Sequence, residues 1–268
     1  MSPPSKPLVL LIATKPRLDS LTNIALPSVA RQSILPSAVY IVSDIRAFTT
    51  KERENLISQF PSIELQFLNN VNSPGAAGTW NTGLFEIERL NGDCYVAIID
   101  DDDVWDADHL ETCYSIAYEN DWPDVVISGL RILKDDIEIP RPVVESVCVD
   151  DFLVGNPGWQ GSNTFVHIKA FQQAGYFTDG LQSSNDRDLA IRLLSIPGIR
   201  VEFSRKFTAN WRLDAEPDCL SRRRGPEKIA GLRKFLQLHG AKMSLDQRTQ
   251  FFTRCYQLFG VAEQELTS

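Results

Sequence analysis

The sequence predicts an α/β protein whose mostly parallel sheet is flanked by helices. Its first half alternates short apolar runs, each ended by breaker residues, with segments that carry helix signals. This alternation is typical of parallel sheets, because the connecting helices cover both faces of the sheet. The length of 268 residues fits one sizeable domain, or a domain with an extension, and 43% apolar residues are ordinary for a globular protein.

The strands of the first half are expected where apolar runs meet turn residues. Leu8–Ala13 is followed by Thr-Lys-Pro-Arg, and Val39–Val42 by Ser-Asp. Two further strands are expected at 63–68 and 94–99. Helices are expected near 19–32, 49–60 and 79–90 and from about 106 onward. Thr49 and Glu52 form a capping box that should begin the second of these helices.

The regular alternation ends after residue 124. Short strands are then expected at 125–128, 131–133, 163–167, 199–203 and 207–211, with one helix at 186–195. Two tail helices follow, one from Pro226 to about Gly240 and one from the Ser244 cap to about Gly260. The tail aromatics recur on one helical face, which predicts core packing or a homodimer contact, with a surface for a lipid acceptor as the alternative.

Composition excludes several classes of partner. The net charge of −8 and the pI near 5.0 argue against nucleic acid, which requires a basic face. The five cysteines show no metal-binding spacing, which predicts reduced thiols in a cytoplasmic protein. The N-terminus has no signal-peptide pattern, and no apolar run approaches the roughly 20 residues that span a bilayer. Any membrane contact is therefore expected to be peripheral.

The most informative segment is an apolar run, Tyr95–Ile99, that ends in four carboxylates, Asp100 to Asp103. Adjacent carboxylates repel one another unless a cation is present. Open α/β sheets bind their ligands at the carboxyl ends of strands, where this acid run is expected. The segment therefore predicts a hard divalent cation, Mn²⁺ or Mg²⁺, that holds a phosphate-bearing ligand; a solvated acidic turn is the alternative.

Further motifs follow one another in order along residues 8–221. They are Leu10–Arg17 with its Thr-x-x-Arg turn, Gln32 with Pro36, Tyr40–Asp44, the Gly-rich Gly75–Gly83, Ile98–Trp105, Gly175–Asp179 and Asn185–Leu193. In this order and spacing they resemble the family 2 glycosyltransferases, which have the GT-A fold. Three positions depart from that family: Trp80 stands in place of an Arg, Asn185 in place of a Glu, and Asp214 in place of a His.

The resemblance implies a Rossmann-like, mostly parallel mixed sheet in a glycosyltransferase domain at 1–221, with a disordered tail at 1–7. A helical C-terminal extension at 222–268 is expected to pack on that domain. The implied activity is metal-dependent, inverting transfer of a sugar from a nucleotide-diphospho-sugar to an acceptor hydroxyl, in glycan or glycoconjugate biosynthesis. UDP is the default nucleotide. The acceptor could be a glycan, a lipid-linked glycan or another hydroxyl compound.

The resemblance also implies roles for individual acids. Asp102 is expected to bind the metal directly, and Asp100 to contact the donor ribose or a metal-bound water. Asp101 is a weaker candidate on the donor side. Asp186 is the candidate general base for the acceptor hydroxyl; its alternative role is an ordinary helix cap.

The remaining predicted contacts surround these acids. Asp44 is expected to bind the nucleobase, and the other donor-side candidates are Thr14, Arg17, Asn81 and Arg222. On the acceptor side the candidates are Trp159 and Gln160, with core packing as the alternative for the Trp. Two rival functions are a sugar-nucleotide pyrophosphorylase-like nucleotidyltransferase and a non-catalytic nucleotide-sugar binding module. The first requires a Gly-rich loop after strand one, and Ala13–Arg17 contains no Gly.

Overall fold

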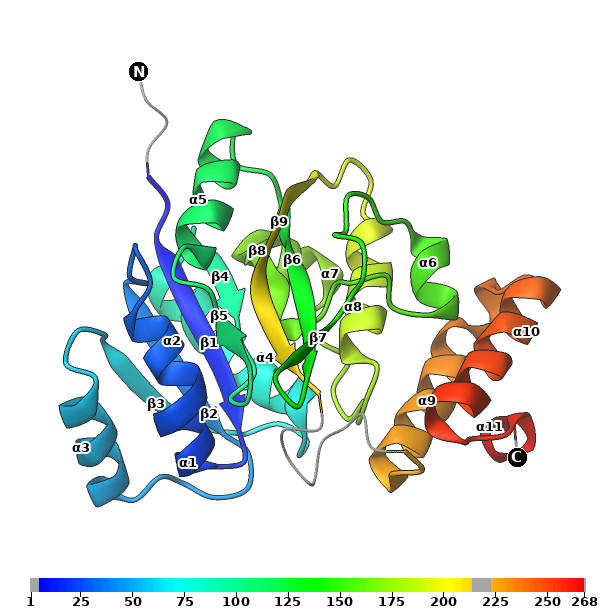
Figure 1. The fold of residues 1–268 in the computed structure, drawn as a ribbon, viewed down its shortest axis with the longest axis horizontal. Helices are drawn as coiled ribbons and strands as arrows, with labels where there is room; N and C mark the ends of the chain where they lie inside the picture. The colour runs from blue at the N-terminus through cyan, green and yellow to red at the C-terminus, as the bar shows by residue number, and fades with distance from the viewer. Residues whose placement is uncertain (1–4, 214–222, 268) are drawn as a thin grey trace.

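A mixed sheet of nine strands forms the centre of the computed structural model, which describes residues 5–213 and 223–267 (Figure 1). The strand order is β3-β2-β1-β4-β8-β6-β9-β5, and β7 pairs with β6. The strands β1 to β4 run parallel, whereas β8 is antiparallel to both β4 and β6. The bounds are β1 Leu8–Thr14, β2 Ala38–Ser43, β3 Leu65–Asn69, β4 Tyr95–Ile98, β5 Val104–Trp105, β6 Val125–Lys134, β7 Ile137–Ile139, β8 Thr164–His167 and β9 Val201–Arg212.

Helices cover both faces of the sheet, as the α/β prediction requires (Figure 1). The strand β1 is apolar throughout because alternate residues face different hydrophobic clusters. Leu10 belongs to the cluster that includes residues of α2, α3 and α5, and Leu11 belongs to the cluster that includes residues of α4, α6, α7 and α8. The bounds are α1 Leu18–Ser20, η1 Leu21–Ala25, α2 Leu26–Ala30, α3 Thr50–Gln59, α4 Ala76–Asn91, α5 His109–Glu119, α6 Val149–Val154, η2 Gly161–Asn163, α7 Ile168–Ala174 and α8 Asn185–Leu194.

The predicted capping boxes are confirmed. Thr49 accepts a hydrogen bond from the Glu52 backbone N–H, and the Glu52 carboxylate accepts one from the Thr49 backbone N–H at 2.7 Å. Ser244 and Gln247 make the equivalent pair at the start of a tail helix. These local signals predict helix starts well because they satisfy backbone N–H groups that have no partner within the helix.

Two pairs of predicted short strands are instead two continuous strands, β6 and β9, so that prediction is wrong. The two strands run parallel, but their register shifts on both sides of Gly129. A Cβ at Gly129 would lie 2.8 Å from the Lys206 carbonyl oxygen, so glycine permits the close backbone approach there. The sequence interruption that indicated separate strands therefore marks an irregular register within longer ones.

The C-terminal helices pack against the same hydrophobic cluster as α4, α6 and α8. The described tail elements are α9 Pro226–His239, η3 Gly240–Lys242, α10 Leu245–Arg254, η4 Cys255–Phe259 and α11 Glu263–Thr267. Phe251 and Phe252 are buried in that cluster, which confirms core packing for these two aromatics, whereas Tyr256 is 64% exposed. A homodimer contact through the tail and the division into domains at residue 221 stay predictions. Within the described residues, no helix is both long enough and apolar enough to cross a membrane.

Candidate functional site

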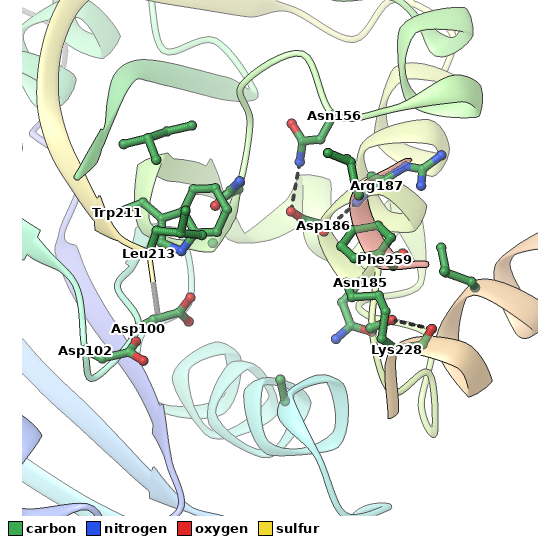
Figure 2. A pocket seen from close by; sticks show the side chains of 18 of the residues that line it. Asp100, Asp102, Asn156, Asn185, Asp186, Arg187, Trp211, Leu213, Lys228 and Phe259 are labelled. Carbon is green, nitrogen blue, oxygen red and sulfur yellow. Dashed lines mark hydrogen bonds between the residues drawn. The ribbon is translucent and has the colours of Figure 1, made fainter. Parts of the chain in front are cut away.

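A cavity of about 700 Å³ lies at the carboxyl ends of β1, β2 and β4 and extends toward α8 and the C-terminal helices (Figure 2). Parallel strands place their carboxyl ends at one edge of a sheet, so the residues that follow them meet there. The cavity brings together eight of the residues that the sequence singled out: Thr14, Arg17, Asp44, Asp100, Asp101, Asp102, Gln160 and Asp186.

The four adjacent carboxylates divide into two pairs with different surroundings. Asp101 is 1% exposed and accepts hydrogen bonds from the Thr14 hydroxyl at 2.5 Å and from the Arg17 guanidinium, whose Nε lies 3.0 Å away. Asp103 accepts hydrogen bonds from the Ser162 hydroxyl and from the Arg212 backbone N–H, at 2.5 and 3.0 Å. These two acids therefore fix the turn after β4 and tie it to β1, β9 and the Gly161–Asn163 turn.

The other pair, Asp100 and Asp102, lines the cavity (Figure 2). The Asp102 carboxylate lies 3.5 Å from the Arg17 guanidinium. Burial raises the pKa of Asp100 well above its ordinary value, and the negative charges of Asp103 and Asp102 raise it further. The repulsion between these neighbouring carboxylates thus disfavours the charged form of Asp100, and a cation beside it would favour that form.

The carboxylate oxygens of Asp100 and Asp102 suit a divalent cation whose remaining coordination positions are filled by a phosphate ligand. The described part of the chain contains no group of three or more His, Cys, Asp or Glu side chains placed to hold a metal alone. Mg²⁺ and Mn²⁺ beside phosphates are commonly held by only one or two carboxylates, with phosphate oxygens and water as the remaining ligands. The chemistry of the site therefore fits a metal that binds together with a nucleotide.

Asp186, at the start of α8, faces the same cavity from the opposite side (Figure 2). Its Oδ2 accepts a hydrogen bond from Asn156 Nδ2 at 2.9 Å, and its Oδ1 accepts one from the Arg187 backbone N–H at 3.0 Å. Burial raises the pKa of Asp186, and the positive charges of Lys228 and Arg187 oppose that rise. The result is an oriented carboxylate whose oxygens keep free lone pairs, as a general base needs.

Asp44 shapes the loop at the end of the cavity next to β2. Its two oxygens accept hydrogen bonds from Asn70 Nδ2 at 2.8 Å and from the Gly75 backbone N–H at 2.9 Å. The loop before α4 is therefore tied to the end of β2. Each carboxylate oxygen can accept a second hydrogen bond, so this role is compatible with the predicted nucleobase contact.

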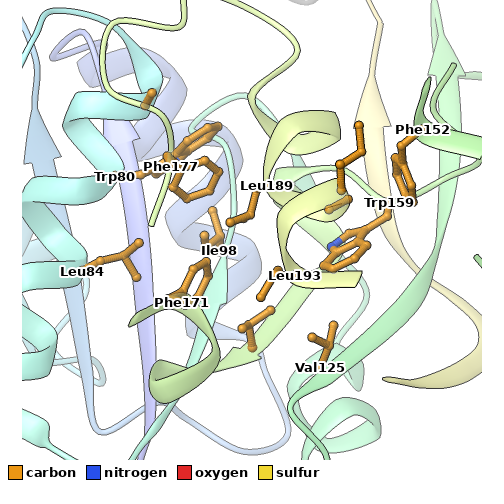
Figure 3. Packing of buried hydrophobic residues seen from close by; sticks show 14 of the residues in the cluster. Trp80, Leu84, Ile98, Val125, Phe152, Trp159, Phe171, Phe177, Leu189 and Leu193 are labelled. Carbon is orange, nitrogen blue, oxygen red and sulfur yellow. The ribbon is translucent and has the colours of Figure 1, made fainter. Parts of the chain in front are cut away.

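Two predicted site residues, Asn81 and Trp159, are turned into the protein interior instead. The Asn81 side chain exchanges two hydrogen bonds of 2.9 Å with the Phe177 backbone, which holds the turn before α8 against α4. Trp159 is 2% exposed, donates to the Thr164 hydroxyl at 2.9 Å and packs beside Phe152 (Figure 3). The position of Trp159 thus agrees with core packing, which was the alternative to an acceptor contact. Arg222 and Asp214 lie outside the described residues, as does part of the predicted N-terminal tail, residues 1–4.

Sequence reasoning missed several cavity residues. Asn156 positions Asp186, and its Oδ1 accepts from the backbone N–H groups of Gly158 and Trp159. An Asn-Pro-Gly sequence is a typical turn of this kind, so the local role of Asn156 could have been predicted from the sequence.

Trp80 Nε1 and Asn185 Oδ1 are buried without a hydrogen-bond partner among the described residues, and both residues line the cavity. They are two of the three departures from the family pattern.

The C-terminal extension contacts the loop before Asp186 directly through Gly231 of α9. A Cβ at this position would lie 2.1 Å from the Ser183 hydroxyl and 2.5 Å from the Ser183 backbone nitrogen. Gly231→Ala is therefore expected to lower the free energy of unfolding by roughly 1–3 kcal/mol, because α9 must move away from the loop. Chemical denaturation measures this. Gly240→Ala is the control, since its Cβ would meet only the Leu236 side chain, at 3.0 Å; equal effects would contradict the proposed contact.

The sheet order, the acid run after β4 and the opposed carboxylate on α8 define a protein of the GT-A fold class. No protein-family model matches the chain. A glycosyltransferase of Acanthamoeba polyphaga mimivirus, R139, described as uncharacterized, is 32% identical over 128 residues, which span 42% of this chain and 51% of the relative. The match thus covers only about half of that protein's length.

Solved structures support the fold along nearly the whole chain. Residues 1–349 of S. aureus TarS in complex with UDP-GlcNAc align with a TM-score of 0.65 at 15% identity, covering 96% of this chain and 74% of that one. The mannosyltransferase PcManGT from Pyrobaculum calidifontis, in complex with GDP-Man and Mn²⁺, aligns with a TM-score of 0.59 at 16% identity, covering 99% and 73%. The predicted GT-A architecture is therefore confirmed.

Proposed function

We propose that this chain is a metal-dependent, inverting family 2 glycosyltransferase that uses a nucleotide-diphospho-sugar in glycan or glycoconjugate biosynthesis. The observation that carries the proposal is the opposition of Asp100 and Asp102 to Asp186 across one cavity. Glycosyl transfer needs charge neutralisation at the leaving diphosphate and proton removal at the acceptor hydroxyl. The two sides of this cavity carry groups for these two tasks. The glycosyltransferase relative and the nucleotide-sugar complexes of the structural neighbours support the same reaction.

The donor occupies the half of the cavity formed by β1, β2 and β4. Asp44 accepts a hydrogen bond from the nucleobase, and Thr14 and Arg17 lie between the nucleotide and the acid run. Asp102 and Asp100 would hold Mn²⁺ or Mg²⁺, and the bound ion would supply Lewis-acid stabilisation of the diphosphate leaving group. The Arg17 guanidinium, 3.5 Å from Asp102, adds a second positive charge beside the leaving group.

The acceptor hydroxyl approaches from the side of α8. Asp186 removes its proton as the oxygen attacks the anomeric carbon, and the diphosphate leaves from the opposite face of the sugar. This direct displacement inverts the anomeric configuration. Asn156 and the Arg187 backbone hold the carboxylate in place, so the base needs little reorganisation during the reaction.

Asn185 and Trp80 line the cavity, and each has a buried polar atom without a hydrogen-bond partner among the described residues; these atoms suit the hydroxyl groups of a sugar. Asn185 Oδ1 is an acceptor, and Trp80 Nε1 is a donor. Buried polar groups without a partner are unfavourable, so a ligand that supplies complementary hydroxyls stabilises the bound state. This pair therefore contributes to the choice of sugar.

A thermal-shift experiment with nucleotides tests the donor half of the site. UDP with Mn²⁺ is expected to raise the melting temperature by about 5–10 °C at a hundredfold excess over the dissociation constant, because a ligand that binds only the native state stabilises it. GDP is expected to give a smaller shift. The same scan without metal should show most of the UDP effect lost.

Asp102→Asn provides the matched variant for this test. The substitution is expected to remove the dependence of the UDP shift on Mn²⁺, since the amide is a poorer ligand for a hard cation. Asp150→Asn, an exposed carboxylate on α6, is the control and should behave like the wild type. A nucleotide shift that is independent of metal in both the wild type and Asp102→Asn would contradict the proposed metal site.

A further inference from the structure

Positively charged side chains gather in the part of the cavity that lies beyond Asp186. Arg141, Arg187 and Arg254 come from three segments far apart in the sequence, and all three line the cavity. Lys228 of α9 also lines it, and its charge acts on Asp186. Figure 2 shows Asp100 and Asp102 on one side of Asp186, and Arg187 and Lys228 on the other. The cavity of this acidic protein is thus negative at its donor end and positive at the opposite end.

Most of these arginines are not neutralised by nearby carboxylates. Arg187 donates to the Phe152 and Leu153 carbonyl oxygens at the end of α6, and Arg141 donates to the Pro157 carbonyl oxygen at 2.7 Å. Arg254 has no hydrogen-bond or ion-pair partner among the residues that the structure describes. Burial lowers the pKa of Arg141, and the charge of Arg254 lowers it further. Burial likewise lowers the pKa of Arg187 to about 10, a direction that Arg254 reinforces.

The loop between α6 and η2 accommodates two of these arginines by means of glycines. A Cβ at Gly158 would lie 2.5 Å from an Arg141 guanidinium nitrogen, and a Cβ at Gly155 would lie 3.0 Å from Arg254 Nε. Gly158 also has a φ of +134°, which other residues rarely adopt. The same loop contains Asn156, which orients Asp186. One short segment therefore orients the proposed base through Asn156 and contacts the guanidinium groups of Arg141 and Arg254 through its glycines.

We propose that Arg141 and Arg254 bind a phosphate group of the acceptor substrate. This inference rests on the proposed function, because it assigns the acceptor to the side of Asp186 away from the metal-binding carboxylates. Guanidinium groups match the oxygens of a phosphate with several parallel hydrogen bonds, and a phosphate between them relieves their mutual repulsion. The acceptor class is therefore a phosphorylated polyol, sugar or glycan, whose hydroxyl reaches Asp186 while its phosphate lies at the arginines.

Binding of small phosphates with the donor end filled tests this assignment. Glucose 6-phosphate and glycerol 1-phosphate are titrated calorimetrically into the protein saturated with UDP and Mg²⁺, with glucose and glycerol as neutral counterparts. The phosphates are expected to bind at least about tenfold more tightly than the neutral compounds, and less tightly as salt increases. Equal binding of phosphorylated and neutral compounds would overturn the inference, as would phosphate binding that occurs only in the absence of UDP, because the phosphates would then occupy the donor end.

Variants separate the arginine site from the donor site. Arg141→Gln and Arg254→Gln are each expected to weaken phosphate binding by about tenfold, with partial recovery in Arg254→Lys, and to leave UDP affinity unchanged. Arg248→Gln, an exposed arginine on the same helix as Arg254, is the matched control. Unchanged phosphate binding in both Gln variants rejects this inference while the proposed function stands. Failure of UDP to bind the wild type rejects the proposed function itself.

Discussion

Asp186→Asn is expected to reduce sugar transfer by about a thousandfold and to leave the affinity for UDP nearly unchanged. General-base catalysis contributes roughly 10²- to 10⁴-fold, and an amide cannot take the proton of the acceptor hydroxyl. The substitution keeps the shape of the side chain, and the proposed nucleotide site lies at the other end of the cavity, near Asp44 and Asp102. Single-turnover transfer from a UDP-sugar measures the rate, and calorimetry measures nucleotide binding.

The pH profile gives an independent test of the same residue. A general base acts only when deprotonated, so transfer falls as the pH falls through its pKa. Because burial raises the pKa of Asp186, this loss is expected at a higher pH than an ordinary aspartate, with a pKa of 3.8, would give. Asn156→Ala removes a hydrogen bond to the charged form and should move the acid limb to still higher pH.

Controls distinguish catalysis from folding and from binding alone. Asp150→Asn should leave both the rate and the pH profile as in the wild type. Unchanged turnover in Asp186→Asn would exclude Asp186 as the base. Nucleotide binding without transfer to any acceptor would favour the binding-module alternative, and release of pyrophosphate during synthesis of a nucleotide-sugar would favour the nucleotidyltransferase.

The meeting of Thr14, Asp44 and Asp100 at one end of the cavity was predictable because these residues follow strands directly. The apolar runs before Thr14, Asp44 and Asp100 indicate buried parallel strands, and parallel strands bring the residues after them to one edge. The residue pattern alone could not divide the acid run, however, and the separate roles expected for Asp100 and Asp102 came from the family resemblance. Which carboxylates face the cavity depends on partners such as Ser162 and the Arg212 backbone, 59 and 109 positions away from Asp103.

The opposite end of the cavity was not predictable from local patterns. Arg254 follows the apolar face of a tail helix, and Arg141 lies in a loop, so each looks like an ordinary surface charge in the sequence. Only the packing of α10 against α6 brings them together. Likewise, Asn81 and Trp159 were predicted in the site, but hydrogen bonds to the Phe177 backbone and to the Thr164 hydroxyl hold the two side chains in the interior.

Asp188 lies two positions after the proposed base and connects α8 to the C-terminal extension. It is 1% exposed and accepts hydrogen bonds from His239 Nε2 of α9 at 2.8 Å, from Arg192 at 2.7 Å and from the Thr178 hydroxyl at 2.7 Å. Of these contacts only the ion pair with Arg192 is indicated by local sequence, because the two residues are four positions apart on a helix, and the structure contains it. A lone His in the tail gave no signal of its partner, because the two residues are 51 positions apart.

Asp188→Ala is expected to lower the free energy of unfolding by about 3–5 kcal/mol, since it leaves the donors of a buried charge network without their acceptor. Asp150→Asn, which alters an exposed carboxylate, should change the free energy of unfolding by less than about 0.5 kcal/mol.

The pH dependence of the unfolding free energy tests whether the charge of Asp188 causes this destabilisation. Burial alone would raise the pKa of Asp188, but the hydrogen bonds from His239, Arg192 and Thr178 outweigh it and hold the pKa at about 2, below the ordinary 3.8. A lowered pKa stabilises the fold above pH 3.8, and this contribution, roughly 2 kcal/mol, is lost between about pH 4 and pH 2. The difference in unfolding free energy between the wild type and Asp188→Ala should therefore shrink by roughly 2 kcal/mol as the pH falls through that window. A difference that stays constant down to pH 2 would mean that packing rather than charge holds α9 to α8.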